Sequence, residues 1–269
     1  GDIAVVQPNA AWADVLIAPL VAALQDVTGV TTVIMNGTGR TRTLEGLDER
    51  MDVLAGNAPT APVAVPMNGA IYLADIMGGQ KTGLFFDQRP NHAFAAGLSQ
   101  GARVLDVFAH VGGFGLAALA QGAASVLAVD GSAPALDLAE QGAAAMGVAE
   151  RFSTRKGDAF DVLTALAEEG AQFDVVICDP PAFAPGKAAL EAGLRAYERV
   201  ARLAAPLVAP DGYLALCSCS HAVDLTKFRN ASARGIGRAG RRGLHCFRGR
   251  DTKRVCLRES GRERESIPF

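Results

Sequence analysis

Residues 104–130 read VLDVFAHVGGFGLAALAQGAASVLAVD, and this stretch decides the fold. An apolar strand ends at Asp106, a turn with three glycines follows, and an Ala-rich helix leads to a second apolar strand that ends at Asp130. Glycines let a backbone approach a ligand closely, and the helix N-terminus is electropositive. A carboxylate after the second strand is placed to accept hydrogen bonds from ribose hydroxyls. The stretch predicts the opening unit of a nucleotide-type cofactor site.

The composition is that of an ordinary globular protein, with 49% hydrophobic and 20% charged residues in 269. No apolar run reaches the roughly 18 residues of a membrane span, and the N-terminus lacks a signal-peptide pattern. An odd number of cysteines, five, argues for reduced thiols, and their spacing is not that of a zinc finger. We therefore expect a cytoplasmic protein with no membrane and no metal partner. The oligomeric state stays open.

Charge is distributed unevenly along the chain. Residues 1–230 carry 15 Lys and Arg against 24 Asp and Glu, whereas residues 231–269 carry 11 against 4. The acidic body is poorly suited to gripping a phosphate backbone. The basic tail shows no apolar periodicity, so its composition favours an irregular segment.

The hydrophobic pattern divides the chain into three parts. Residues 1–78 predict a small α+β module: a strand at 3–7, a helix at 11–27, a strand at 30–35, and paired strands around Asn68-Gly69. From residue 79 to 230, strands alternate with helices, which favours a doubly wound, mainly parallel Rossmann-like sheet. The expected strands are 103–107, 125–129, 152–155, 173–178 and 212–217, and the expected helices are 88–99, 114–121, 133–146, 159–168 and 188–205. Residues 231–269 are expected to form the irregular tail.

Four acids fall at the ends of predicted strands: Asp106, Asp130, Asp158 and Asp179. Ligands of parallel sheets bind at this edge, so four such acids in sequence indicate one ligand-lined rim. Two of them have competing local interpretations. Asp158 opens a helix and is a natural N-cap, and Asp130 precedes Ser132, which can cap the next helix.

The segment Cys178–Phe183 reads CDPPAF and follows the fourth strand of the alternating region. Its two prolines remove N–H donors and leave carbonyls free to accept. A carboxylate with free carbonyls suits the amino group of a planar base, on which Phe183 is placed to stack. A plain exit from a strand is the alternative interpretation.

The next strand ends in YLALCSCSH, residues 213–221. Cys217 and Cys219 are two residues apart and are expected on one face, with Cys219 nearer the strand end. A thiolate is a strong nucleophile once neighbours such as His221 lower its pKa. A buried core cysteine is the competing interpretation.

Five motifs, GQKTGLFFDQR, VLDVFAHVGGFG, GDAF, CDPPAF and LCSCSH, occur in this order between residues 79 and 221. Together they resemble class I S-adenosylmethionine-dependent methyltransferases, and in particular the RlmI-like group of 23S ribosomal RNA cytosine-C5 methyltransferases. The resemblance covers about residues 62–228. It implies S-adenosylmethionine as cofactor, ribosomal RNA as partner, and methyl transfer to C5 of a cytosine.

The resemblance also implies a role for individual residues. Asp130 is expected at the ribose, Asp158 at the adenine, and Asp179 with Pro180 at the target base, while Cys219 aligns with the thiolate that attacks C6 of the ring. The other residues expected to border the cofactor are Lys81, Thr82, Gly83, Phe85, Asp87, Asp106, Phe108, Gly112, Gly113, Ser132 and Ala159. Asp87 is also expected to cap the following helix.

The chain departs from the family pattern at three points. RlmI-like proteins usually open with an RNA-binding PUA domain, and this chain is expected either to start after that domain or to lack it. Ala182 stands where many cytosine-C5 enzymes carry a second cysteine. Residues 243–269 show no pair of alternating runs for the usual final hairpin, so these strands are expected to be missing, which leaves the fifth strand exposed as an edge.

Three other functions are weighed against this one. A methyltransferase acting on a base nitrogen or a small molecule would leave Cys219 structural. An inactive homologue would bind the cofactor without methyl transfer. A NAD-dependent dehydrogenase shares the glycine turn, but its G-x-G-x-x-G spacing is absent and it explains neither D-P-P nor C-S-C-S.

Overall fold

The computed structural model describes residues 1–78, 83–247 and 253–259. The chain divides into two compact units. The first unit contains Gly1–Val65 and the described residues of Leu73–Asp87. The second unit contains Pro66–Tyr72 and the described residues from Gln88 onward. Each unit is treated separately below.

The first unit is built on a three-stranded sheet in the order β1-β2-β3, in which β1 and β2 are parallel and β3 is antiparallel. Its elements are β1 (Ile3–Val6), α1 (Ala11–Val15), α2 (Ile17–Thr28), β2 (Thr32–Gly37), α3 (Arg40–Leu44) and β3 (Arg50–Ala55). The central strand β2 is buried along its whole length. The helix expected at 11–27 is interrupted at Leu16, because Pro19 has no N–H for a helical bond to the Val15 carbonyl.

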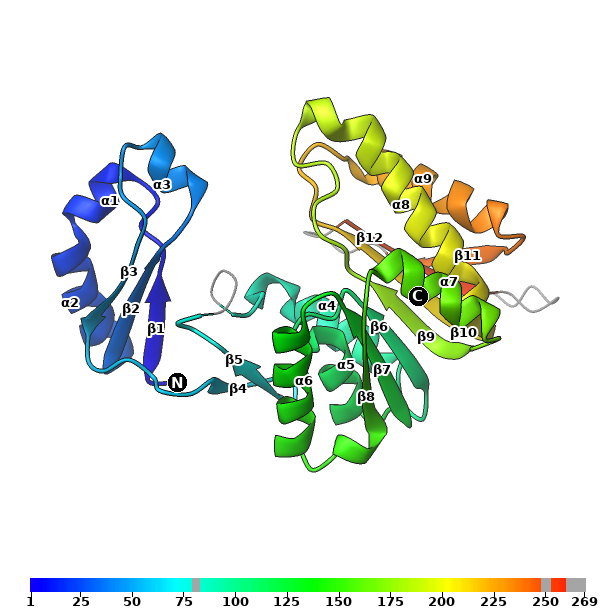
Figure 1. Ribbon diagram of the computed structural model, residues 1–269, viewed down its shortest axis with the longest axis horizontal. Helices are drawn as coiled ribbons and strands as arrows, with labels where there is room; N and C mark the ends of the chain where they lie inside the picture. The colour runs from blue at the N-terminus through cyan, green and yellow to red at the C-terminus, as the bar shows by residue number, and fades with distance from the viewer. Residues whose placement is uncertain (79–82, 248–252, 260–269) are drawn as a thin grey trace. The chain divides into compact units, whose positions relative to one another are not determined.

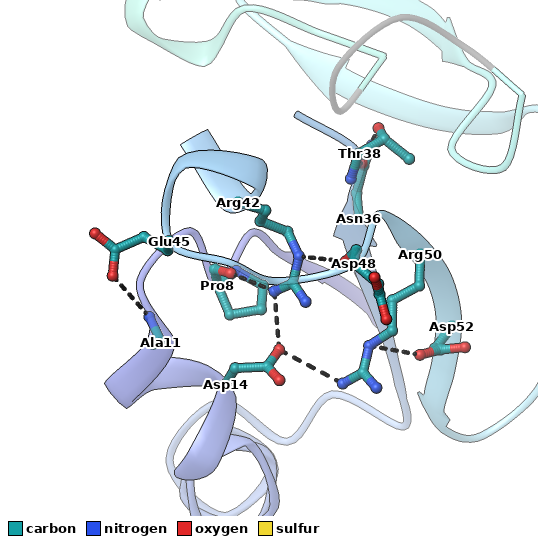
Figure 2. A network of polar contacts seen from close by, with 10 residues as sticks. All are labelled: Pro8, Ala11, Asp14, Asn36, Thr38, Arg42, Glu45, Asp48, Arg50 and Asp52. Carbon is teal, nitrogen blue, oxygen red and sulfur yellow. Dashed lines mark hydrogen bonds and ion pairs between the residues drawn. The ribbon is translucent and has the colours of Figure 1, made fainter. Parts of the chain in front are cut away.

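A buried arginine ties the loops of this unit together (Figure 2). Arg42 Nη1 donates to the Pro8 carbonyl at 2.6 Å and to Asp14 Oδ1 at 2.8 Å. Its Nε donates to the Asp48 carbonyl at 3.0 Å, and its side chain is only 2% exposed. Arg50 reaches the same Asp14 oxygen at 3.5 Å from a more exposed position. Arg42 therefore satisfies two loop carbonyls and one carboxylate with a single buried guanidinium.

The short hairpin that links the units is formed by β4 (Val63–Met67) and β5 (Ala70–Ala74). Its turn is Asn68-Gly69, and both residues have positive φ, 55° and 79°. Asn and Gly are the residues that adopt this conformation most easily, which confirms the sequence-based prediction of paired strands at this turn.

The second unit holds a seven-stranded sheet in the order β11-β12-β10-β9-β6-β7-β8. The five strands from β10 to β8 are mutually parallel, and β12 and β11 are antiparallel additions at the β10 side. The strands are β6 (Arg103–Val107), β7 (Ser125–Asp130), β8 (Phe152–Lys156), β9 (Phe173–Cys178), β10 (Val208–Ser218), β11 (Gly243–Phe247) and β12 (Lys253–Glu259).

Helices cover both faces of this sheet (Figure 1). Helices α4, α5 and α6 contact one another in sequence, and α7, α8 and α9 do the same. Their bounds are α4 (Arg89–Gly97), α5 (Gly113–Ala120), α6 (Ala133–Ala145), α7 (Ala159–Glu168), α8 (Leu190–Ala204) and α9 (Leu225–Arg238). Short 3-10 turns at Phe86–Gln88, Ala149–Arg151, Lys187–Ala189 and Ala205–Leu207 complete the described helical segments.

One hydrophobic core lies between the parallel strands and the second group of helices, and buried residues of α5 and α6 cover the other face. Leu105, Val107, Val176 and Leu163 in this layer are completely buried. Strands buried on both faces need near-continuous apolar runs, and the sequences of β6 and β9 meet this requirement. The apolar run of each strand stops where the strand leaves the core.

The strand order places a topological switch between β6 and β9. The chain moves from β6 to β7 and β8 on one side, and then returns to β9 on the other side of β6. Connections leave in opposite directions at such a point, which opens a crevice at the carboxyl ends of the strands. We call this rim of the parallel strands the carboxyl edge.

The predicted fold class is confirmed. Every expected strand and helix between residues 88 and 217 is present, and β6 and β9 have the predicted bounds. The sequence-based interpretation missed α3 and β3, which lie between the strand expected at 30–35 and the expected paired strands, where no element was predicted.

The expectation for the C-terminal segment was wrong. The described part of residues 231–269 contains the end of α9 and the antiparallel hairpin β11–β12. Strand β12 pairs with β10 from Tyr213↔Arg258 to Ser218↔Lys253, so the final strands are present and β10 is not an edge. Backbone pairing with an open strand compensates for a weak local pattern, which is why the tail's composition was misleading.

No helix among the described residues is long and apolar enough to cross a membrane.

We expect Arg42→Ala to lower the free energy of unfolding of the first unit by about 2 kcal/mol or more, because hydrogen bonds of a charged group contribute roughly 1.5–3 kcal/mol. Urea unfolding followed by fluorescence measures this, since the single tryptophan of the chain, Trp12, lies in α1.

The matched control is Arg50→Ala, whose side chain is 42% exposed. Its ion pairs are at the surface, so a loss below about 1 kcal/mol is expected. Equal losses in the two variants would contradict the assigned role of Arg42.

Candidate functional site

The turn between β6 and α5 has an unusual backbone. Phe108 and His110 have positive φ, 64° and 50°, and Gly112 follows at 80°. Non-glycine residues rarely adopt this conformation, and each costs of order 1–3 kcal/mol when strained. Such conformations persist where surrounding contacts impose them, and they concentrate at functional sites.

Asp106 holds one end of this turn. Its Oδ2 accepts a hydrogen bond from the Gly115 N–H at 2.8 Å, across the first turn of α5. A Cβ on Gly115 would lie 2.8 Å from Val126 Cγ1, so only glycine lets the helix approach the sheet this closely. Asp106 is completely buried, and its Oδ1 has no hydrogen-bond partner among the described residues.

The charge state of Asp106 reflects this environment. Burial raises the pKa of Asp106 to about 7, and the charges of Asp179 and Asp130 act in the same direction, against the hydrogen bond from Gly115. These three predicted strand-end acids therefore lie close enough to interact. Together they make the crevice between β6 and β9 electronegative, which favours a cationic group beside them.

Asp130 holds the other end of the turn. Its Oδ2 accepts from the His110 N–H at 2.8 Å, and its Oδ1 accepts from the Ser132 N–H at 2.8 Å. Ser132 is the N-cap of α6, and its Oγ accepts from the Ala135 N–H at 3.3 Å. The local capping role that the sequence indicated for Ser132 is thus present, and the Asp130 carboxylate is fixed by two backbone donors.

Asp158 and Gly113 also have structural partners. Asp158 is exposed and caps α7, since its Oδ1 accepts from the N–H groups of Phe160 and Asp161 at 2.9 and 3.3 Å. Ala159 begins the helix and is buried. The Gly113 carbonyl accepts from the Tyr72 hydroxyl at 3.0 Å. Capping leaves the second carboxylate oxygen of Asp158 available at the carboxyl edge.

The segments after β9 and β10 meet at the carboxyl edge. The Asp179 N–H donates to the Val107 carbonyl at 3.2 Å, which fixes the start of the D-P-P segment beside the end of β6. The Cys219 thiol lies 3.8 Å from the Pro180 carbonyl oxygen and donates to it. The two motifs that sequence analysis singled out separately are therefore neighbours in space.

Cys219 and Cys217 differ in surroundings. Strand β10 ends at Ser218, so Cys219 lies just beyond it and is exposed, whereas Cys217 is buried. The expectation that they share one face stays a prediction, and the two residues differ in burial because Cys219 lies beyond the strand end. Burial strongly raises the pKa of the third described cysteine, Cys178. Only Cys219 among these three presents its thiol to solvent.

Sequence analysis missed a hydrogen-bonded clamp around Cys219. Ser218 Oγ donates to the Tyr197 hydroxyl at 2.9 Å, and the same hydroxyl lies 2.7 Å from Ser220 Oγ. Ser220 Oγ in turn accepts from the Ala184 N–H at 3.0 Å. All these atoms are buried. The clamp fixes the residues on both sides of Cys219 and joins them to the segment after D-P-P.

An aromatic cluster lines the same edge. Phe183 forms edge-to-face contacts with Phe108 and Tyr197, with ring centroids 6.3 and 5.1 Å apart, and lies 6.2 Å from Phe160. Phe108, Phe160 and Phe183 each follow a different strand end. The cluster gives the electronegative crevice an apolar wall on which a planar base can stack.

The remaining predicted site residues belong to the first unit or lie outside the described residues. Lys81 and Thr82 are in the second category. Gly83 is buried with φ 81°, while Phe85 and Asp87 are exposed. The expectation that Asp87 caps α4 was wrong: the N-cap is Gln88, which makes no side-chain capping bond, because a 3-10 turn at Phe86–Gln88 leads directly into the helix.

Residue types that ligate metals are dispersed in the part of the chain that the structure describes. Within those residues, His, Cys, Asp and Glu side chains form no group of three that could hold a metal ion. His221, suggested as a neighbour that activates the thiol, is exposed.

A parallel sheet with this strand order, a glycine turn at its switch point and acids after successive strands define an α/β protein that binds a nucleoside-containing cofactor. A family model described as S-adenosylmethionine-dependent methyltransferase matches residues 37–239. The chain belongs to this family, and the cofactor of the family is S-adenosylmethionine.

Within this family, the chain is similar to curated proteins of one name. The chain is 42% identical over 203 residues to ribosomal RNA large subunit methyltransferase I of Aeromonas hydrophila, covering 74% of this chain and 51% of that protein. The protein of the same name from Vibrio cholerae is 39% identical over 203 residues, with the same coverage. The chain thus spans about half the length of the curated relatives it matches.

Solved structures confirm the fold. A proposed S-adenosylmethionine-dependent methyltransferase from Streptococcus mutans superposes with a TM-score of 0.78 at 18% identity, covering 96% of this chain and 69% of that one. A proposed methyltransferase solved in complex with S-adenosylhomocysteine gives 0.77 at 19% identity, with the same coverage.

The fit of the cofactor can be judged from the crevice itself. S-adenosylmethionine carries a sulfonium and an ammonium, and the buried Asp106 Oδ1 lacks a partner beside two further carboxylates. A cationic group near these carboxylates is favoured, whereas a dinucleotide with two phosphates would add negative charge there. The residues present fit the cofactor of the family.

The raised pKa of Asp106 predicts a pH dependence of stability. Between the ordinary value of 3.8 and about 7, the folded state binds a proton that the unfolded state has released. Stability of the chain without cofactor is therefore expected to fall as pH rises through this window. Thermal unfolding at several pH values measures this, and Asp106→Asn is expected to remove this part of the slope.

Asp137→Asn is the control, because Asp137 is exposed on α6. It should keep the slope of the unmodified chain. If Asp106→Asn kept it as well, the buried carboxyl would not be the titrating group.

Tyr197→Phe removes a hydroxyl that serves both serines of the clamp. With a net contribution of roughly 0.5–1.5 kcal/mol for each hydrogen bond, we expect a loss of about 1–3 kcal/mol in stability. The rate at which a thiol reagent modifies Cys219 should also change. Ser218→Ala removes the bond to Tyr197 and also the acceptor of the Ser220 N–H at 3.3 Å, so a comparable loss is expected; unchanged stability in both variants would contradict the clamp.

Proposed function

We propose that this protein transfers the methyl group of S-adenosylmethionine to C5 of a cytosine in large-subunit ribosomal RNA, in the cytoplasm, through a covalent adduct with Cys219. The acceptor is suggested by the names of the curated relatives. The single observation that carries the mechanism is the exposed Cys219 thiol 3.8 Å from the Pro180 carbonyl oxygen at the switch point of the sheet.

The cofactor is held by the acids of the carboxyl edge. Asp106 faces its cationic end, Asp130 accepts from the ribose hydroxyls, and the free oxygen of Asp158 accepts from the adenine amino group. Each Asp130 oxygen receives one backbone bond and keeps a second lone pair for a hydroxyl. When bound, the cofactor supplies an electrophilic methyl group.

Ten further positions are proposed to border the cofactor. Five of them belong to the turn between β6 and α5, the turn between β7 and α6, and the first turn of α7: Phe108, Gly112, Gly113, Ser132 and Ala159. Gly83, with Phe85, Asp87, Lys81 and Thr82, is proposed at the methionine end on the strength of the GQKTGLFFDQR motif alone.

The target base is held by the D-P-P segment. The Asp179 carboxylate and the Pro180 carbonyl are acceptors for the exocyclic amino group of cytosine, and Phe183 is placed to stack on the ring. Pro180 and Pro181 cannot donate, so the segment offers acceptors without competing donors. This arrangement favours an amino-bearing base over a keto-bearing one.

The covalent step uses the Cys219 sulfur. Its thiolate adds to C6 of the cytosine, and the electron pair of the C5–C6 double bond moves to C5, which accepts the methyl group. A base then removes the proton from C5, the double bond re-forms, and the thiolate leaves. Since a resting thiol donates to the Pro180 carbonyl, ionisation breaks that bond and frees the sulfur for attack.

A single cysteine carries the proposed reaction. Ala182 stands where a second cysteine is found in many enzymes of this class, and the described Cys178 and Cys217 are buried. Expulsion of Cys219 after methylation therefore proceeds without a second thiol. Methyl transfer to a base nitrogen, with Cys219 structural, is the alternative acceptor chemistry, and cofactor binding without turnover is the third outcome.

We expect Cys219→Ala to abolish methylation of large-subunit ribosomal RNA while the dissociation constant for S-adenosylmethionine stays within about twofold. The matched control is Cys217→Ala, two residues earlier and buried, which should keep its activity. Incorporation of labelled methyl groups into RNA fragments, with mass spectrometry of the modified base, measures both.

Each alternative gives a different result. Activity of Cys219→Ala with methyl on a ring or amino nitrogen identifies the noncovalent acceptor chemistry. Cofactor binding by the unmodified chain, with no labelled RNA or small molecule, identifies the inactive homologue. RNA carrying 5-fluorocytosine should form an adduct with the unmodified chain and not with Cys219→Ala, because fluorine at C5 blocks proton removal.

A further inference from the structure

Among the described helices of the second unit, most of the positive charge lies on two. The sequences of α5, α6 and α7 contain no Lys or Arg, and α6 and α7 each contain two acids. By contrast, α8 and α9 carry seven Lys and Arg between them and only two acids, Glu191 and Glu198. Both helices follow segments of the carboxyl edge, and their contacts with each other are extensive (Figure 1).

The charges on α9 are largely compensated. Arg234 Nε and Arg238 Nη1 both donate to the carboxylate of Glu198, which is nearly buried between the helices. Lys227 pairs with Asp224, the N-cap of α9. These contacts fix α9 against α8 and leave less charge for a ligand.

Three arginines on α8 form an exposed stripe: Arg195, Arg199 and Arg202. Their spacing of four and three residues places them on one side of the helix. They extend over about 10 Å at 1.5 Å per residue. Among the described residues, no acidic side chain lies within ion-pair distance of these three guanidinium groups.

Contacts between side chains connect the arginine stripe to the segment that follows D-P-P. The Arg199 guanidinium lies over the Phe160 ring, 4.3 Å from its centroid. Phe160 is in the first turn of α7 and lies 6.2 Å from Phe183, which follows the D-P-P segment beside Cys219. Arg199 therefore stands at the rim of the proposed base pocket, and the other two arginines continue from it along α8.

We propose that Arg195, Arg199 and Arg202 bind the phosphates of the single-stranded RNA that carries the target base. This rests on the proposal that RNA is the acceptor. A base extruded into the aromatic pocket leaves its own phosphate and those of its neighbours outside the rim, where the guanidinium groups stand. Because the rest of the protein is acidic, a polyanion needs a local positive surface such as this stripe. The guanidinium groups are regularly spaced, as the phosphates of RNA are, which favours RNA over an acidic protein as the partner.

Salt dependence tests this stripe, because each phosphate contact contributes about 0.7 to the slope of log affinity against log salt for single strands. Binding of a fluorescein-labelled single-stranded RNA to the full chain is measured by anisotropy at several KCl concentrations. The triple variant Arg195→Gln/Arg199→Gln/Arg202→Gln should lower the slope by about 2, and each single variant by about 0.7.

The matched control is Arg103→Gln, which removes one exposed positive charge at the start of β6, the opposite end of the strand from the site. It should keep the slope of the unmodified chain. The triple Arg→Lys variant should also keep it, because the charge is retained. Thermal unfolding shows whether each variant is folded.

An unchanged slope in the folded triple Gln variant overturns the stripe, as does an equal decrease in Arg103→Gln. Absence of RNA binding by the unmodified chain at low salt overturns both the stripe and the RNA acceptor. Methylation of the same RNA by the unmodified chain is measured separately. A reduced slope in the triple Gln variant, with no methyl transfer by the unmodified chain, supports the arginine stripe and counts against the proposed function. Methyl transfer together with an unchanged slope supports the proposed function and overturns the stripe.

Discussion

Two carboxylates hold the turn on which the whole site depends. Phe108 and His110 occupy left-handed backbone conformations that cost free energy. Asp130 compensates by accepting the His110 N–H, and Asp106 compensates by accepting the Gly115 N–H. Each acid comes from a different strand, so the turn keeps its shape only while the two strands stay in register. The cofactor site is thereby tied to the sheet itself.

The same acids make the carboxyl edge unfavourable for a negative charge. Asp106 is buried with an unpartnered oxygen, and its two acidic neighbours raise its pKa further. A cation placed there removes the repulsion, so cofactor affinity and fold stability are linked: any ligand that binds the folded state alone stabilises it. Asp106 and Asp130, which shape the turn between β6 and α5, therefore also favour a positively charged group beside that turn.

The sequence predicted the catalytic fold well because its signals are local. Apolar runs ending in acids identify β6 and β9, and Asp158 and Ser132 are caps recognisable from neighbouring residues. The clamp was not predictable, because Tyr197 lies more than twenty residues from its serines and nothing in α8 marks it. The roles assigned to residues around the cofactor rest on sequence motifs. The structure brings the Cys219 thiol to the Pro180 carbonyl, and this contact does not decide which reaction the thiol performs.

The C-terminal hairpin shows how the basic tail supports the site. Strand β12 pairs with β10 up to Ser218↔Lys253, the residue immediately before Cys219, while β9 pairs with the other side of β10. The strand that presents the thiol is therefore paired on both sides up to Leu216, and by β12 alone from there to Ser218. A β10 paired on one side only would be free to shift, and Ser218 would no longer hold the Tyr197 hydroxyl. The position of Cys219 thus depends on a segment whose composition alone indicated irregular structure.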